Sequence, residues 1–303
     1  MLTRRRILQS VGLAALGALS LGGYAFGIEP LRLRVQRYAV SPSGWPEGLH
    51  LKVAALADIH ACRPWMSVER IEHIVEVTNS LKADVIVLLG DYAAGHHWVT
   101  DQVPSNEWSR ALSGLQAPLG AHAILGNHDW WDDRTAQERG SGPVIGRQAL
   151  ERAGIPVYEN EVAKLHKGAN AFWLAGLGDQ LALLSGRRWG RRTLEGVDDL
   201  PGMLAKINDT APVVLLAHEP DIFPRVPDRV ALTLSGHTHG GQVRLFGYSP
   251  VVPSRFGNRY AYGHVTEGSR HLIVSGGLGC SIAPVRFGVP PEIVVVEISA
   301  PAA

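Results

Sequence analysis

Short apolar runs and segments with helical spacing follow one another along this chain of 303 residues. Leu51–Ala57 and Val85–Leu89 are apolar runs of strand length, which fits strands buried on both faces. Between them, apolar residues from Val68 to Leu81 recur at helical spacing, and Ser67 stands at the N-cap position. The alternation of strands and helices predicts an α/β core.

The same patterns predict further elements along the chain. Helices are expected at 106–115, 144–153 and 197–207, and strands at 121–125, 157–158, 172–175, 213–216, 230–234, 272–274 and 293–298. The early alternation and the later succession of strands indicate a substantial mixed sheet. Because no internal repeat and no low-complexity linker divides residues 28–303, we expect one domain there.

Residues 1–27 follow neither pattern. Three arginines at positions 4–6 precede an apolar stretch over residues 11–26 that has no amphipathic period. A basic tip before an apolar region is typical of a signal peptide, and the segment TRRRILQ at 3–9 resembles the twin-arginine export signal. We therefore expect export through the twin-arginine machinery to the periplasm or the outer face of the inner membrane. The stretch also approaches the length of a membrane span, about 17 residues, so an anchor through residues 11–26 is the alternative.

Composition and charge restrict the function classes. Hydrophobic residues make up 46% of the chain and charged residues 19%, which is a globular balance and argues against disorder. The net charge of +1 lacks the basic excess of a dedicated nucleic-acid binder, so no nucleic-acid-binding module is expected. Cys62 and Cys280 are too few for a disulfide framework or a Cys-rich zinc site. They form either a single bridge or two buried thiols.

Residues able to carry chemistry stand directly after five predicted strands. The strands end in Asp58-Ile59-His60, Gly90-Asp91, Gly126-Asn127-His128-Asp129, His218-Glu219 and Gly236-His237-Thr238-His239. Ligands in open α/β folds gather beyond the carboxyl ends of strands, so these segments are expected to converge. Their Asp, His and Asn side chains suit Mn, Fe, Zn or Mg and lack the thiolates of a structural zinc site. Each motif alone has an ordinary explanation, such as turn chemistry for Gly90-Asp91.

The ordered set of motifs resembles the calcineurin-like metallophosphoesterases over about residues 51–298. The resemblance implies a four-layer αββα sandwich of two mixed β-sheets flanked by helices, with a binuclear metal site at the sheet edge. It implies two divalent metal ions, with Mn favoured, and a water or hydroxide bridging them. One ion would be held by Asp58, His60, Asp91 and His239, and the other by Asp91, Asn127, His218 and His237. It also implies that His128 faces the substrate phosphate as the catalytic residue, protonating the leaving alkoxide or stabilising charge.

Differences within the motifs narrow the substrate class. The loop that begins Gly90-Asp91 lacks the second Asp and the Arg that the phosphoprotein phosphatases carry there. The segments around His218 and His237, and the late Gly-rich run 277–287, resemble a bacterial membrane-associated phosphodiesterase branch. This resemblance implies hydrolysis of a phosphodiester or pyrophosphate bond, with a lipid-linked substrate such as a phospholipid or UDP-2,3-diacylglucosamine as one option. The alternatives are a phosphomonoesterase and a non-catalytic metal-binding protein of the same fold.

Several residues near these motifs are candidates for substrate or membrane contact. Trp130 follows the Asn-His-Asp segment and either forms a wall for a lipid or base or packs the loop onto the domain. Arg286 is expected to contact the substrate. The arginine-rich run 187–192 either contacts an anionic membrane surface or is solvated, and residues 96–97 either touch substrate or are a solvated histidine pair.

Overall fold

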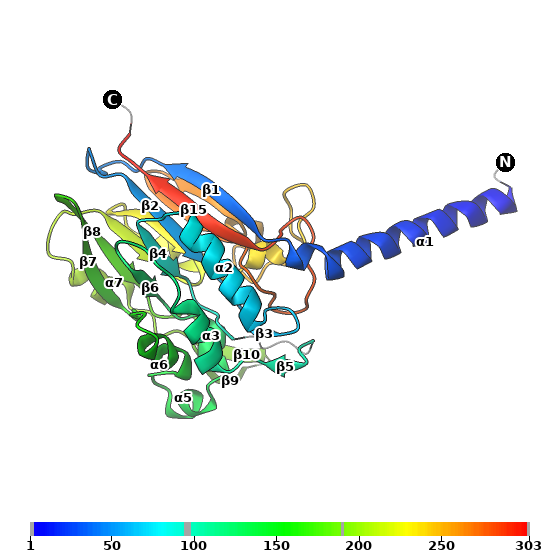
Figure 1. The fold of residues 1–303 in the computed structure, drawn as a ribbon, viewed down its shortest axis with the longest axis horizontal. Helices are drawn as coiled ribbons and strands as arrows, with labels where there is room; N and C mark the ends of the chain where they lie inside the picture. Colours follow the sequence, from blue (N-terminus) through cyan, green and yellow to red (C-terminus); the bar gives the residue numbers. More distant parts are fainter. Residues whose placement is uncertain (1–2, 94–97, 189–190, 302–303) are drawn as a thin grey trace.

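Two mixed β-sheets pack face to face, and helices cover both outer faces (Figure 1). The computed structural model describes residues 3–93, 98–188 and 191–301. The arrangement confirms the four-layer αββα sandwich with two mixed sheets. Cys62 and Cys280 are free and buried rather than bridged.

The first sheet brings three parallel strands to one edge. Its order is β1 (Arg34–Val40), β15 (Glu292–Ile298), β2 (Leu51–Leu56), β4 (Val85–Leu88) and β6 (Ala121–Ala123). Strands β2, β4 and β6 run parallel, and β15 runs antiparallel to β2. Its outer face is covered by α2 (Val68–Ser80), α3 (Ser105–Leu112) and α6 (Ile145–Arg152). The oxygen of Ser67 accepts the N–H of Arg70, so the predicted N-cap of α2 is confirmed.

The second sheet has four parallel strands at its centre. Its order is β13 (Gly263–Glu267), β14 (Arg270–Val274), β12 (Val230–Ser235), β11 (Val213–Leu216), β8 (Asn170–Gly176) and β7 (Glu161–Lys167). The two edge strands, β13 and β7, pair antiparallel with their neighbours. The outer face packs against α7 (Leu200–Ala205) and the 3-10 helix η2 (Pro220–Arg225). The helix predicted at 197–207 is therefore shorter than expected, because it starts only after the cap at Asp199.

The remaining elements are short and lie in the connections. They are β3 (Cys62–Arg63) with β5 (Asp101–Gln102), the hairpin of β9 (Leu183–Arg188) and β10 (Arg191–Glu195), α4 (Asn127–Trp131), α5 (Arg134–Arg139), η1 (Glu29–Leu31), η3 (His239–Gly241) and η4 (Gly257–Tyr260). Residues 157–158 were expected as a strand and contribute a single bridge, from Val157 to Ala123.

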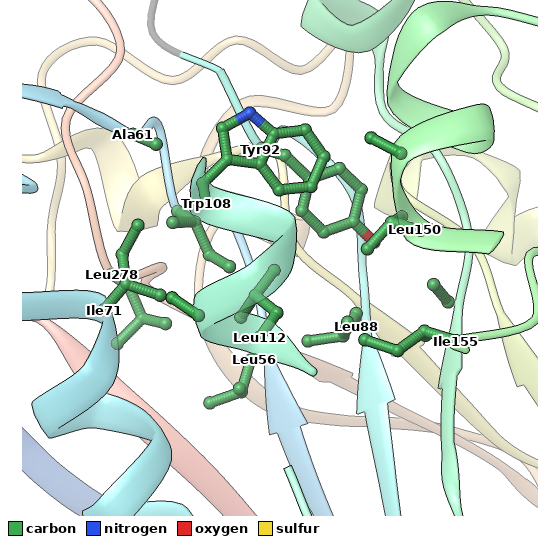
Figure 2. Close-up of a cluster of buried hydrophobic side chains, with 14 of the residues drawn as sticks. Leu56, Ala61, Ile71, Leu88, Tyr92, Trp108, Leu112, Leu150, Ile155 and Leu278 are labelled. Carbon is green, nitrogen blue, oxygen red and sulfur yellow. The ribbon is translucent and has the colours of Figure 1, made fainter. Parts of the chain in front are cut away.

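The buried strands show why their sequences read as continuous apolar runs. Along β4, Val85 and Val87 point between the two sheets, whereas Ile86 and Leu88 point toward the helices. Figure 2 shows Leu88 in that outer layer with Leu112 of α3 and Leu150 of α6. Each such side chain stabilises the fold by roughly 1.5–3 kcal/mol when fully buried. The core is therefore built on both faces of each sheet, which leaves the strand ends to carry polar residues.

The N-terminal helix α1 (Arg4–Gly27) projects away from the sandwich (Figure 1). It is long and apolar enough to cross a membrane, and its apolar window is not buried against the domain. Its last turn contacts the domain. The carbonyl of Ala25 accepts the N–H of Arg286 at 2.9 Å, and the Tyr24 and Phe287 rings meet edge to face at 6.2 Å. The helix is thus consistent with a signal sequence or an anchor.

Candidate metal centre

The predicted metal ligands gather where the carboxyl ends of the two sheets meet. Asp58 and His60 follow β2, Asp91 follows β4, and Asn127 follows β6. From the other sheet, His218 follows β11, and His237 and His239 follow β12. The parallel strands of both sheets therefore bring five separate segments of the chain to one edge, as expected from the sequence.

The ligand atoms lie close together and are largely buried. His60 Nε2 lies 3.1 Å from His239 Nε2, and His239 Nε2 lies 3.4 Å from Asp58 Oδ1. The carboxylate of Asp91 stands between two groups, with Oδ2 at 3.6 Å from His60 Nε2 and 3.2 Å from His218 Nε2. These contacts form buried clusters of ligand atoms within 4.8 Å of one another.

A second pair of acceptors closes the other side of the site. His237 Nδ1 lies 2.9 Å from Asn127 Oδ1, and His237 Nε2 lies 3.0 Å from the carbonyl of Pro253. Since a carbonyl can only accept, we infer that Nε2 carries the proton and that Nδ1 offers its lone pair toward Asn127. Two acceptors then face each other, which is the arrangement that a shared cation stabilises.

Two other imidazoles, those of His60 and His218, also face backbone carbonyls, but with Nδ1. His60 Nδ1 lies 3.0 Å from the carbonyl of Ala93, and His218 Nδ1 lies 2.6 Å from the carbonyl of Leu89. Each ring therefore donates to the backbone with Nδ1 and points Nε2 into the site. His218 Nε2 is buried and faces Asp91 Oδ2 at 3.2 Å. The set of buried imidazole, carboxylate and amide donors fits a binuclear site for divalent metal ions.

The backbone of the site is held in an unusual conformation. Among the residues that the structure describes, nine other than glycine have a positive φ, and five of these are predicted ligands. The five are Asp58 (φ 53°), His60 (48°), Asp91 (58°), His237 (66°) and His239 (51°). The left-handed region costs about 1–2 kcal/mol per residue for an L-amino acid. The surrounding sheets must therefore hold these loops in place.

Glycines in the motifs make room for the ligands. A Cβ on Gly126 would lie 2.4 Å from Asp91 Oδ1, and a Cβ on Gly236 would lie 2.5 Å from Asp58 Oδ2. Gly90 has φ 95°, and its Cβ would lie 2.4 Å from the backbone nitrogen of Gly126. Close approach of neighbouring loops, as well as sharp turning of the chain, thus requires glycine here.

Burial and neighbouring charges set the protonation of the site. Burial raises the pKa of Asp58 to about 7 and lowers the pKa of His60 to about 3. Burial also lowers the pKa of His237 and His239, which keeps these rings neutral. At Asp91 burial opposes ionisation, but the charges of His218 and His128 outweigh it and hold the pKa well below its ordinary value. Burial also opposes a charge on His218, but the charge of Asp91 outweighs it and holds the pKa of His218 well above its ordinary value. His218 and Asp91 therefore form a buried ion pair, and a divalent cation bound there would displace the proton of His218.

Asp129 is a site residue whose role the sequence does not reveal. Its Oδ2 accepts the backbone N–H groups of Asp91 and Gly126, both at 2.9 Å, and its Oδ1 accepts the N–H of Tyr92 at 2.9 Å. It thereby fixes the loop after β4 to the loop after β6. Burial raises the pKa of Asp129 to about 7, and the charge of Asp91 adds to this effect.

We expect Asp129→Asn to weaken metal binding by about 10–100-fold, the range for loss of a group that orients ligands. The amide would present an NH₂ to N–H donors and so lose part of this network. Metal titration calorimetry measures the change. Asp133→Asn is the matched control, because Asp133 is also buried and accepts two backbone N–H groups, from Ala136 and Ile145. Equal metal affinity in the two variants would contradict the role given to Asp129.

Glu219 is a second site residue without a role in the sequence analysis. It is 2% exposed and forms a buried cluster with His218 and His237. Its Oε2 accepts the backbone N–H and the side-chain amide of Gln180, both at 3.1 Å, while its Oε1 has no hydrogen-bond partner. In the sequence, the one sign of this role is that Glu219 directly follows His218 in the His218-Glu219 motif.

A pocket of ≈ 490 Å³ opens over the metal ligands. Its floor includes Asp91, Asn127 and His128, and its walls are mostly apolar. His128 lies beside the ligand cluster, with its ring 5.0 Å from that of His60 and 5.2 Å from that of Trp131. The structure therefore brings the predicted catalytic histidine together with the predicted ligands.

The two predicted substrate contacts lie elsewhere. Trp130 is 2% exposed and packs into the core between the first sheet and the helices that cover its outer face. The next residue, Trp131, lines the pocket. Arg286 is fully buried and donates to the carbonyls of Gly276, Gly279 and Val289, with Nη2 3.3 Å from His239 Nδ1. It braces the loop behind His239 instead of lining the pocket.

Two other candidate segments are only partly described. The histidines at 96–97 lie outside the described residues. The arginine-rich run falls on the hairpin of β9 and β10, and residues 189–190 of it lie outside the described residues as well. Solvation and membrane contact of this run therefore both stay predictions.

The sandwich fold and the buried His/Asp clusters define a metal-dependent phosphoesterase, a hydrolase of phosphoric esters. The family profile for calcineurin-like phosphoesterases matches residues 51–241. The chain belongs to the calcineurin-like phosphoesterase family.

Known relatives match over nearly the whole chain. The uncharacterized metallophosphoesterase YkuE of Bacillus subtilis is 31% identical over 306 residues, covering 97% of this chain and 96% of the relative. Phosphodiesterase YaeI of Escherichia coli is 30% identical over 304 residues, covering 98% and 100%. Among solved structures, NAD nucleotidase of Haemophilus influenzae matches with 13% identity and a TM-score of 0.45. That match covers 76% of this chain and about half, 51%, of the nucleotidase.

Proposed function

We propose that this protein is a metal-dependent phosphodiesterase that hydrolyses a phosphodiester or pyrophosphate bond of a lipid-linked substrate. The observation that carries the proposal is the lining of the pocket. Among the residues that the structure describes, the lining includes no Lys and no Arg. A phosphomonoester carries two negative charges on one phosphoryl group, which calls for such a cation, whereas each phosphoryl group of a diester or of a disubstituted pyrophosphate carries one. The name of the Escherichia coli relative, a phosphodiesterase, supports the same class.

The ligands divide into two sets that share one carboxylate. Asp58, His60 and His239 would hold one ion together with Asp91, and Asn127, His218 and His237 would hold the second together with Asp91. The position of Asp91 Oδ2 between His60 and His218 supports this division. A mixed set of carboxylate, amide and imidazole ligands suits Mn, and equally admits Fe, Zn or Mg.

In the proposed reaction, the bound metal ions and His128 have different roles. When bound, the two cations would supply Lewis-acid stabilisation of the phosphate and a water of lowered pKa. His128 is positioned to hold a proton for the leaving oxygen, because its ring faces the pocket beside the ligand cluster. Its backbone N–H donates to Asp91 Oδ1 at 2.8 Å, so the loop that carries His128 is fixed to the central ligand.

The apolar walls support a lipid-linked substrate. Val243, Val251, Ile282 and Val285 line the pocket next to the metal ligands, and Trp131 adds an aromatic face. Such walls favour an acyl or prenyl chain over a sugar or a second charged group. Phospholipids and UDP-2,3-diacylglucosamine are two molecules that combine a diester or pyrophosphate with acyl chains.

For location, we propose export followed by anchoring through α1. Positions 3–9 resemble a twin-arginine signal, and α1 is long enough to span a membrane. Cleavage near residues 25–27 would remove the contacts of Ala25 and Tyr24 with the loop around Arg286 and Phe287. These contacts favour retention of the helix, with the domain at the outer face of the inner membrane.

The proposed activity predicts faster hydrolysis of a phosphodiester than of a phosphomonoester. After removal of metals from the full chain in detergent, Mn is expected to restore hydrolysis of bis-p-nitrophenyl phosphate. Hydrolysis of p-nitrophenyl phosphate should be at least about tenfold slower, which corresponds to about 1.4 kcal/mol in the barrier. Faster monoester cleavage would instead indicate a phosphomonoesterase. Two bound metals without hydrolysis of either ester would indicate the non-catalytic alternative.

A further inference from the structure

Five exposed apolar side chains lie on the pocket wall or on the segment between the pocket-lining residues Val243 and Val251. Phe246 is 107% exposed, Ile282 72%, Val251 64%, Tyr248 61% and Leu245 46%. We call these five residues the apolar rim. Val251 and Ile282 also line the pocket, so the rim is continuous with its apolar walls. A soluble surface rarely gathers large apolar groups in this way without a partner.

The tip of the rim is a strained hairpin turn. Leu245 and Tyr248 exchange backbone hydrogen bonds of 2.8 and 2.9 Å, which closes a two-residue turn at Phe246 and Gly247. Both turn residues have positive φ, 50° and 84°. Such turns favour Asn-Gly, and a bulky aromatic residue at the first position is a conformational outlier. The fold gains no burial from this phenylalanine, because its ring is fully exposed. An outlier without a structural benefit points to a function for the ring.

The rim is tied directly to the end of α1. Phe287 pairs with the rim hairpin, since the N–H of Arg244 donates to its carbonyl at 2.7 Å. The ring of the same Phe287 contacts Tyr24 in the last turn of α1, and Arg286 donates to Ala25. The loops that carry the rim therefore lie beside the point where α1 leaves the domain, as Figure 1 shows for the yellow and orange loops near the helix end.

We propose that the apolar rim docks into the same lipid bilayer that α1 spans, so that the pocket mouth opens onto the membrane. A retained α1 holds the domain within reach of one surface only, and that surface is lipid. Side chains such as Phe246 and Tyr248 are suited to the interface, where an aromatic body is buried and a polar end stays hydrated. Docking would bring the metal ligands to the depth of lipid phosphates. The inference deepens the proposed lipid-linked substrate but stands on the surface rather than on the catalytic activity.

The test places a fluorescent probe on the rim of the full chain. Phe246→Cys, labelled with an environment-sensitive dye, is reconstituted into vesicles of phosphatidylethanolamine and phosphatidylglycerol. Some of the lipids carry a spin label near the headgroup. Cys62 and Cys280 are buried, and the unmodified chain measures their background labelling. Interfacial side chains insert to roughly 5–10 Å, so we expect strong quenching by the shallow spin label. Tyr248→Cys is the second rim position, in case the first variant folds poorly.

The matched control is Ile145→Cys. Ile145 is an apolar side chain that is 51% exposed at the start of α6, which lies away from α1 in Figure 1. Quenching at both rim positions that is several times greater than at Ile145 supports the proposal. Equal quenching at the rim and at the control position overturns it. A blue shift at the rim that disappears on dilution, without quenching by the spin label, would mean a second copy of the chain and also overturns it.

The same samples separate docking from catalysis. Phe246 does not line the pocket, so Phe246→Cys is expected to hydrolyse bis-p-nitrophenyl phosphate at the normal rate. Normal hydrolysis without quenching would leave the proposed activity intact and reject the docking surface. Quenching at the rim, together with no hydrolysis by the unmodified chain, would support the docking surface and reject the proposed activity.

Discussion

Asp91→Asn is expected to abolish metal binding and activity together. Asp91 is 1% exposed, and its Oδ2 stands between His60 and His218, so both metal positions depend on it in the proposed division of ligands. The amide has the same shape but presents a neutral group, and an NH₂ on one side, to the cations. Because loss of an orienting partner already costs about 10–100-fold, loss of the shared ligand should cost more than about 100-fold in activity.

Metal content by mass spectrometry and the rate with bis-p-nitrophenyl phosphate measure both effects in one preparation. Asp84→Asn is the control, because Asp84 stands at the opposite end of β4. There it accepts the N–H of Lys52 and pairs with Lys167 at 2.6 Å. That variant should keep its metals and its rate. Full metal content in Asp91→Asn would mean that the carboxylate is not a shared ligand.

His128→Ala is expected to have the contrasting effect, which is loss of turnover with metals retained. The imidazole lines the pocket, but the backbone N–H of residue 128, which binds Asp91, remains in the alanine variant. General acid catalysis by a positioned side chain contributes about 10²–10⁴-fold, so kcat should fall by this amount. Metal content and kcat are measured together.

An exposed imidazole on an edge strand supplies the control for this variant. His264 lies on β13 and stacks on His271, so His264→Ala removes a ring of the same type without touching the pocket. It should leave kcat unchanged. If His128→Ala lost its metals as completely as Asp91→Asn, His128 would be a ligand and not an acid catalyst.

The gathering of ligands could be predicted because it follows from sheet architecture. Strands such as β2, β4 and β11 are buried on both faces and appear as uniform apolar runs. Their ends are therefore marked sharply by the first polar residue. The edge strands β1, β7 and β13 were not predicted. Their residues are partly exposed and mix polar with apolar side chains, so no apolar run marks them.

The local geometry of the ligands could not be predicted. Asp58 and His60 stand two residues apart, a spacing that would place them on one side of a strand, but both lie beyond β2 with positive φ. Asp129 holds backbone groups that are 37 and 38 residues away, and such partners leave no local signal. Similarly, the sequence alone does not distinguish an arginine that donates to backbone carbonyls, as Arg286 does, from one that binds phosphate.

The five left-handed ligand residues bear on whether the chain is an enzyme or only a scaffold. At about 1–2 kcal/mol each, their combined strain is roughly 5–10 kcal/mol, comparable with the whole stability of an ordinary domain. A descendant that had given up chemistry and needed only the sandwich would gain stability by replacing any of them with glycine or by relaxing the loops. Selection for folding alone would therefore erode this geometry first. The five residues together therefore point to loops shaped to hold a ligand, because folding of the sandwich gains nothing from their strain.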